Sequence, residues 1–246
     1  MPGYKVNWKF REIFSGLHVP PDLPAVVRVD GWNFHDVSKR IGLSRPFDRR
    51  LIKSLVMASV KVMRSGLPVV LAFSFSDEIS YVLAPPLPWK GRIEKLVSIL
   101  ASLTSSVVSR WLRTWAPFDG RVVVLEEDEI PEYLNWRQME AWRNALNSYA
   151  IIALEAEGYR GREAADVLRG MKAPELHDLI FKKLGINVAK VPAWQRRGVV
   201  VRRKKYLKKV NGDVLRRKIS VDWSPPLFST DEGRRYVLES LEKDKR

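Results

Sequence analysis

Acidic side chains stand at the ends of short apolar segments, where they could bind a metal ion. Asp30 follows an apolar run at residues 25–29, and Asp77 and Glu78 separate two further apolar runs. Carboxylate oxygens are the ligands that Mg²⁺ prefers, and Mg²⁺ usually takes one or two of them and leaves its other positions to water and phosphate. Asp, Gly and Ser are also favoured in turns for local reasons. The spacing therefore supports two interpretations, a magnesium site and ordinary turn chemistry.

The composition narrows the kinds of site that the chain could build. Its 246 residues include no Cys, which excludes disulfides, thiol nucleophiles, iron–sulfur ligation and Cys-containing zinc sites. Only His18, His35 and His177 are available as imidazole ligands. We therefore expect a metal in this protein to be bound by oxygen.

Hydrophobic periodicity places the acidic residues on a sheet. In chain order, the expected elements are a strand at 25–29, a helix at 48–64, strands at 69–75 and 79–83, a helix at 92–115 and a strand at 121–125. This β-α-β-β-α-β order is typical of a ferredoxin-like sheet in an α/β (α+β) fold. The first and third strands of such a sheet are antiparallel central neighbours. Asp30 and Asp77 are therefore expected to meet, with Glu78 as a third carboxylate at the same corner.

The C-terminal half has a different character. Helical patterns are expected at 132–157, 162–169 and 175–184, followed by a β-hairpin with strands at 199–206 and 214–221. Asn211 and Gly212 between these strands suit a tight hairpin turn. We expect a palm catalytic domain at 1–125 and, at 126–246, a helical and basic-hairpin region packed on the palm in the same compact body.

Charge is concentrated in this hairpin. Residues 194–218 carry eleven Lys and Arg against one Asp, out of a net charge of +15 for the chain. An excess of this size attracts polyanions, so nucleic acid is the expected partner. The alternative is a solvated edge strand whose Lys residues prevent aggregation. Residues expected to contact nucleic acid through the ribbon or beside it are Trp194, Arg197, Arg202, Arg203, Lys204 and Lys205.

No stretch is apolar enough to span a membrane, and the N-terminus has no apolar export signal. We expect a soluble, cytoplasmic protein. An acidic pair on a palm-like sheet in a strongly basic chain points to metal-dependent nucleotidyl transfer. Bound metal ions would offset the repulsion between an anionic substrate and the carboxylates.

Five motifs, in order, resemble the tRNA-histidine guanylyltransferase family and the related 3′-to-5′ tRNA polymerases. They are VVRVDGWNFH at 26–35, RPFD at 45–48, SDEISYV at 76–82, FDGRVVV at 118–124 and YLNWRQ at 133–138. The resemblance implies a polymerase-like palm that adds nucleotides to tRNA 5′ ends after activation by ATP or GTP. It also implies a homotetramer built as a dimer of dimers.

The resemblance also implies roles for single residues. Asp30, the Gly31 carbonyl and Asp77 would bind two Mg²⁺ ions, and Glu78 would support catalysis. The implied nucleotide-binding residues are Asp30, Gly31, Trp32, Asn33, Phe34, His35, Asp48, Ser76, Asp77, Arg92 and Lys95. Arg137 and Asn187 join the residues expected to bind tRNA.

The chain departs from the family where eukaryotic members have His-Ile-Asn-Asn. It reads Trp142-Arg143-Asn144-Ala145 there, which makes it similar to the archaeal and bacterial branch with templated 5′-end repair. Phe47 stands where the family often has Asn. Two alternatives stay open: a palm-type nucleotide cyclase, which shares the Asp pair, and a non-catalytic tRNA-binding module.

Overall fold

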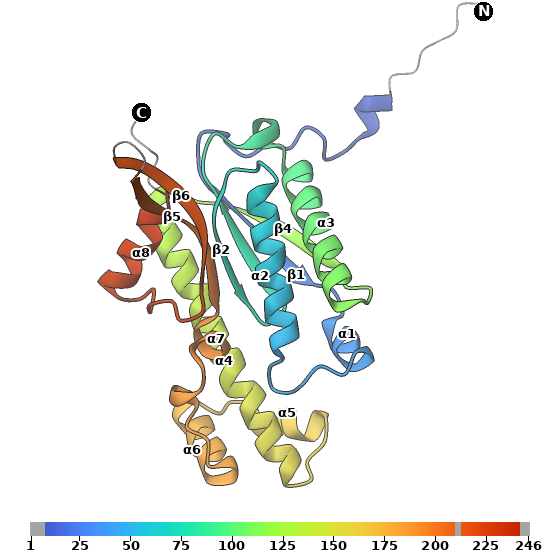
Figure 1. The fold of residues 1–246 in the computed structure, drawn as a ribbon. Coiled ribbons are helices and arrows are strands. Elements are labelled where there is room, and N and C mark those ends of the chain that lie inside the picture. Colours follow the sequence, from blue (N-terminus) through green and yellow to red (C-terminus); the bar gives the residue numbers. More distant parts are fainter. Residues whose placement is uncertain (1–7, 210–212, 242–246) are drawn as a thin grey trace, which may run out of the picture.

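The computed structural model describes residues 8–209 and 213–241, which form one antiparallel sheet with helices on both faces (Figure 1). The strand order is β4-β1-β3-β2-β5-β6. The strands are β1 (Ala25–Gly31), β2 (Val69–Phe75), β3 (Glu78–Leu83), β4 (Phe118–Val124), β5 (Val199–Lys209) and β6 (Asp213–Asp222). The first four follow the split order that the sequence predicts, so the mixed α/β fold class is confirmed.

Helices connect and cover the strands. They are α1 (Phe34–Arg40), α2 (Arg49–Arg64), α3 (Ile93–Leu112), α4 (Ile130–Ala156), α5 (Arg162–Leu168), α6 (Ala173–Leu184), α7 (Ala193–Arg197) and α8 (Asp231–Leu241). Short 3₁₀ segments are η1 (Trp8–Arg11), η2 (Pro88–Gly91), η3 (Glu127–Glu129) and η4 (Val188–Lys190). No helix in the described part of the chain is long and apolar enough to cross a membrane.

The two faces of the sheet bury different side chains, because successive strand residues point to opposite sides. Val27 on β1 and Ile79 on β3 belong to the core beneath α2 and α3, whereas Val26 and Val82 pack with residues of α4 and α8. Strands β2 and β3 are buried along their whole length. Their near-continuous apolar runs follow from this covering of both faces.

The basic ribbon of β5 and β6 continues the palm sheet, since β5 pairs with β2 in a register that sets Ala72 opposite Val201. Both ribbon strands are longer than the sequence predicts. The expected Asn211-Gly212 turn lies outside the described residues.

Three helices were not expected. The sequence predicts no helix over the residues of α1, because only Phe34 and Val37 in it are buried, which is too few for a periodic signal. The five-residue α7 has no buried residue, and α8 follows a Pro-rich stretch.

Candidate active site

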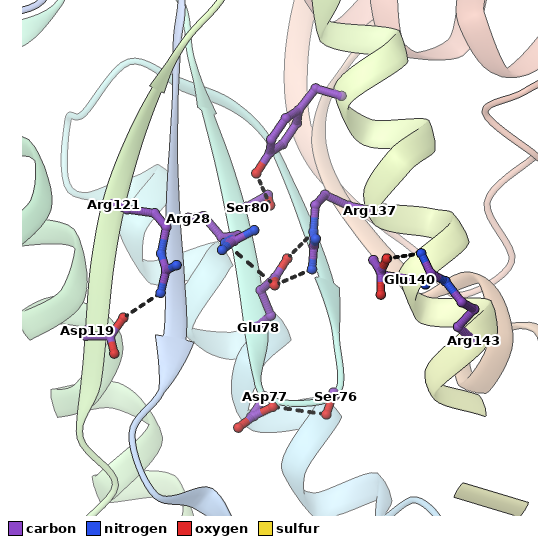
Figure 2. Close-up of polar contacts among 11 residues, drawn as sticks. Arg28, Ser76, Asp77, Glu78, Ser80, Asp119, Arg121, Arg137, Glu140 and Arg143 are labelled. Carbon is purple, nitrogen blue, oxygen red and sulfur yellow. Dashed lines mark hydrogen bonds and ion pairs between the residues drawn. The ribbon is translucent and has the colours of Figure 1, made fainter. Parts of the chain in front are cut away.

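Two carboxylates meet at one corner of the sheet. Asp30 lies directly opposite Glu78 in the β1–β3 ladder, and Asp77 occupies the turn before β3. The backbone N–H of Gly31 donates a hydrogen bond to the carbonyl oxygen of Asp77 at 3.1 Å, which holds the end of β1 against this turn. Ser76 Oγ donates to Asp77 Oδ1 at 3.0 Å (Figure 2). The expected meeting of Asp30 and Asp77 is therefore confirmed as geometry.

Gly31 is needed at this corner for close packing. A Cβ atom there would lie 2.2 Å from the ring of Phe34. That ring packs edge-on against Phe118, with 5.0 Å between centroids. The contact anchors α1 to the end of β1 and leaves the Gly31 backbone beside the two carboxylates.

Among the residues that the structure describes, the carboxylate pair has no cationic partner. Burial and the nearby Asp30 carboxylate raise the pKa of Asp77 to about 6. Within residues 8–209 and 213–241, no Lys or Arg forms an ion pair with Asp30 or Asp77. Two close carboxylates of this kind fit a hard divalent cation, which would relieve their repulsion. Nor does that part of the chain hold a cluster of three or more potential metal-binding side chains. A bound Mg²⁺ would therefore need backbone, water or phosphate oxygens as further ligands.

The raised pKa of Asp77 predicts a pH-dependent stability in the metal-free protein. Because the folded pKa of about 6 exceeds the ordinary value of 3.8, stability that is present below about pH 4 is lost as the pH rises through 6. The full loss is up to about 3 kcal/mol. Asp77→Asn should remove it, so that the variant unfolds at higher urea than the wild type at pH 7 in EDTA but not at pH 4. A difference that is the same at both pH values would show that Asp77 titrates normally.

Glu78 does not join the pair as an open ligand. Its carboxylate accepts two hydrogen bonds from Arg137 of α4, from Nε at 2.9 Å and from Nη2 at 2.7 Å. Arg28 Nε of β1 lies 3.8 Å from the same carboxylate. Figure 2 shows both arginines directed at Glu78, away from Asp77. The expected third carboxylate is thus neutralised within the protein, and Glu78 supports the corner by fixing β1, β3 and α4 together.

Arg137 is only 8% exposed. Its guanidinium carbon also lies 4.5 Å from the ring centroid of Trp136 and 5.4 Å from that of Phe75. In the structure the Arg137 guanidinium balances the charge of Glu78. The tRNA contact expected for Arg137 stays a prediction, and it would compete with this ion pair.

A cavity of about 770 Å³ opens beside the corner. Ser76, next to Asp77, lines it together with His35, Asp48, Phe47 and Trp194. They come from the β2–β3 turn, from α1, from the loop before α2, and from α7. The fold therefore brings segments together at the cavity that are distant in sequence. Four of them were expected to bind nucleotide or nucleic acid. The size suits a small-molecule ligand.

Asp48 lies in the wall of the cavity, where it caps the N-terminus of α2. It accepts hydrogen bonds from the backbone N–H groups of Ser44 and Arg50 and forms an ion pair with the Arg50 side chain. The Arg50 side chain is the main cause that lowers the pKa of Asp48 to about 2. The carboxylate thus shapes the loop that borders the cavity, and its proposed contact with a nucleotide competes with these bonds.

Arg92 and Lys95 lie at the opposite end of the sheet from Asp30. Nine residues connect β3 to α3, which begins at the end of the sheet where β1 starts, and Arg92 bridges to His18 (Figure 1). Ala25 at the start of β1 lies five positions before Asp30, a distance of about 17 Å along the strand. The structure therefore does not bring Arg92 and Lys95 together with the Asp30 corner of the same chain, and their contact with a triphosphate stays a prediction.

Two of the four ribbon residues expected to contact tRNA, Arg202 and Arg203, make contacts within the protein. Arg202 lies over the Tyr236 ring, with 3.6 Å from its guanidinium carbon to the ring centroid, and donates to the Tyr236 carbonyl at 2.9 Å. Arg203 donates to the carbonyl oxygens of Met63 and Val69. Both arginines thus bond within the protein, and the tRNA contacts expected for them stay predictions that would compete with these bonds. Lys204 is exposed, and the structure does not describe the side chain of Lys205.

The remaining expected tRNA residues lie around α7. Trp194 is half-buried against Phe47, with 6.2 Å between ring centroids, so it faces the cavity. Asn187 caps η4 by accepting from the Ala189 N–H at 3.0 Å. Arg197 lies 3.4 Å from the Pro225 carbonyl, and its buried Nε has no partner.

Sequence reasoning missed Arg28 and the Arg45–Glu155 pair. Arg28 precedes Asp30 by two residues, so strand alternation alone places both on one face. Arg45 binds Glu155 across the cavity wall at 2.7 Å. This ion pair joins the loop before α2 to α4. Its two residues are 110 positions apart, so no local sequence pattern predicts it.

Comparison with known proteins identifies relatives along most of the chain. The model of the family described as tRNAHis guanylyltransferase matches residues 8–126, and that described as Thg1 C terminal domain matches residues 128–236. The tRNA(His) guanylyltransferase of Schizosaccharomyces pombe is 31% identical over 234 residues, which cover 90% of this chain and 85% of that protein. A probable tRNA(His) guanylyltransferase of Drosophila melanogaster is 34% identical over 198 residues, covering 76% and 69%.

A solved structure described as a bacterial tRNA(His) guanylyltransferase (Thg1)-like protein in complex with ATP is also similar. It has a TM-score of 0.76 and 26% identity, and the match covers 94% of this chain and 95% of that one. A second structure of such a bacterial protein, in complex with GTP, has a TM-score of 0.72, with the same identity and coverage.

Proposed function

Because this chain belongs to the tRNA(His) guanylyltransferase family, whose members are nucleotidyltransferases, we propose that it adds nucleotides to tRNA 5′ ends in the 3′-to-5′ direction. The substrates are a tRNA and nucleoside triphosphates, and ATP or GTP first activates the 5′ phosphate. ATP and GTP in the similar bacterial structures support this choice of substrates. In line with the family resemblance, we place this activity in a cytoplasmic homotetramer.

The observation that carries the proposal is the uncompensated pair Asp30 and Asp77 beside the cavity. Their carboxylates and the Gly31 carbonyl would hold two Mg²⁺ ions. When bound, the ions would neutralise phosphate charge and favour in-line displacement at phosphorus. Transfer of a nucleotidyl group needs no side-chain nucleophile, so positioning and electrostatics account for catalysis.

The chain's own residues position the reactants. The cavity takes the base and ribose of the activating nucleotide, with Ser76 and His35 next to the metal corner. Glu78, held by Arg28 and Arg137, keeps β1 and β3 in register with α4 beneath the corner. Lys204 and Lys205 on the ribbon stay as proposed contacts for tRNA phosphates.

The assay that tests this function uses 5′-monophosphorylated tRNA transcripts that lack their first nucleotide, with each of the four bases at the opposing position. Since the Trp142-Arg143-Asn144-Ala145 segment lacks the eukaryotic motif, selectivity should come from pairing with that opposing base. We expect the complementary nucleotide to be added at least about 10-fold faster than the others, a selectivity of about 1.4 kcal/mol.

Transcripts with a 5′ triphosphate should react without ATP or GTP activation, since the leaving pyrophosphate is already present. Addition of G at equal rates opposite all four bases would contradict templated selection. Consumption of nucleoside triphosphate to a cyclic product without tRNA would instead favour a nucleotide cyclase.

A further inference from the structure

Three tryptophans are exposed at the end of the sheet that carries the acidic corner. Trp32 is 56% exposed, Trp115 is 66% exposed and Trp111 is 46% exposed. The rings of Trp32 and Trp115 contact each other edge to face, with 6.3 Å between centroids. A folded chain normally buries side chains of this size, so a cluster of exposed indoles marks a binding surface.

The position of this Trp32–Trp115 pair relative to the corner is set by the backbone. Trp32 follows Asp30 by two residues, a separation of at most about 7 Å along the chain. The Trp32 N–H donates to the carbonyl of Pro117 at 3.0 Å, and Gly31 pairs with Phe118. The loop after α3 is thereby held beside the end of β1, as Figure 1 shows for α3 and α1.

Cationic residues surround the pair. The last turn of α1 carries Lys39 and Arg40, and the end of α3 carries Arg110 and Arg113. Arg40 Nη1 lies 3.5 Å from the carbonyl oxygen of Trp115, so its charge lies beside the backbone of the loop that carries Trp115. Exposed aromatic rings among Lys and Arg are the combination that binds nucleic acid, by base stacking together with phosphate contacts.

We propose that Trp32 and Trp115 form a stacking platform for the terminal base at the 5′ end of the RNA substrate. The inference rests on the proposed function, since it assigns the place of the RNA end at that same site. An RNA whose 5′ phosphate reaches Asp30 and Asp77 has one uncovered base face at its terminus. The indole pair lies within about one nucleotide of the corner and covers that face, which aligns the phosphate for activation.

The test measures stacking without catalysis. The probe is a 5′-phosphorylated RNA hairpin of about 12 base pairs with 2-aminopurine at its 5′ terminus, titrated with the full-length protein in Mg²⁺ without any nucleoside triphosphate. Stacking on indole quenches 2-aminopurine, so the wild type should quench the terminal probe and leave a loop-labelled hairpin unchanged. Trp32→Ala and Trp115→Ala should each abolish the terminal quench and weaken binding by about 5- to 160-fold, as expected for one stacked base.

Two variants serve as controls. Trp115→Phe keeps an aromatic face and should retain most of the quench. Trp8→Ala removes a tryptophan of similar exposure, 64%, from the N-terminal segment and should change neither quenching nor affinity. Because no nucleoside triphosphate is present, no nucleotide can be added. The result therefore does not depend on nucleotidyl transfer, and failure of the proposed function would appear only in the tRNA assay.

Unchanged quenching and affinity in both Ala variants would overturn the platform. A second copy of this chain could also cover the two tryptophans. Light scattering on the same variants without RNA tests this, because it measures the mass of the oligomer. If every variant that loses the quench also loses its oligomeric state, the tryptophans form a subunit contact and the proposal is wrong. Loss of quenching at unchanged mass supports it.

Discussion

Replacing Asp77 by Asn is expected to lower the rate of nucleotide addition to tRNA by about 10³-fold, and Asp30→Asn should do the same. Each variant keeps the shape of the side chain but removes a negative oxygen ligand from the proposed metal site, and metal ions supply several kcal/mol of charge stabilisation in such reactions. The measurement is single-turnover addition to an end-labelled tRNA at saturating Mg²⁺. The affinity for tRNA should change less than about 3-fold, because neither carboxylate contacts phosphate without a metal.

Asp119→Asn is the matched control. Asp119 is the cross-strand partner of Asp30 on β4, which flanks β1 on the side away from β3. Its side chain is more than half exposed and lies 3.5 Å from Arg121. Its replacement should alter the rate by no more than a few-fold. Full activity of Asp77→Asn or Asp30→Asn would contradict the metal assignment, and a parallel loss of activity in Asp119→Asn would point to a general effect of negative charge at this edge of the sheet.

The acidic corner could be predicted from sequence because it depends on local patterns and one topological rule. The apolar runs before Asp30 and around Asp77 indicate strands, and the split order then fixes which strand ends meet. The strong helical periodicity of residues 48–64 likewise gave α2 to within one residue of its observed start. Strands and long amphipathic helices carry their hydrophobic pattern within a short window of sequence, so the elements of the palm could be predicted.

The partners of long polar side chains could not be predicted in the same way. Glu78 and Arg137 are 59 positions apart, and Arg203 reaches the carbonyl of Met63 across 140 positions. Charge density suggested that the ribbon arginines face a partner molecule. The structure shows that two of them instead satisfy carbonyl groups of the protein, because a buried carbonyl without a hydrogen bond is costly. Assigning such residues requires the packing of α2 and α8 against the sheet, which no single segment encodes.

Arg137→Met should destabilise the fold by about 3 kcal/mol, because it leaves the buried Glu78 carboxylate without its bidentate partner. The value lies at the lower end for a broken buried pair, since Arg28 stays 3.8 Å from Glu78. The melting temperature should fall by roughly 6 to 12 °C. Arg143→Ala on the same helix is the control: Arg143 forms an exposed ion pair with Glu140, so its loss should cost no more than about 0.5 kcal/mol.

The pH dependence separates the lost charge pair from lost packing. Burial already raises the pKa of Glu78, and Arg137 is the largest influence that lowers it. Without Arg137 the pKa of Glu78 rises further, so protonation at low pH relieves the uncompensated charge. The deficit in the free energy of unfolding relative to the wild type should therefore be large at pH 8 and shrink as the pH falls toward 5. Urea titrations at both pH values measure it. An equal deficit at pH 8 and pH 5 would mean that Arg137 acts through the packing of its guanidinium over the rings of Trp136 and Phe75, and that Glu78 is neutralised by Arg28 alone.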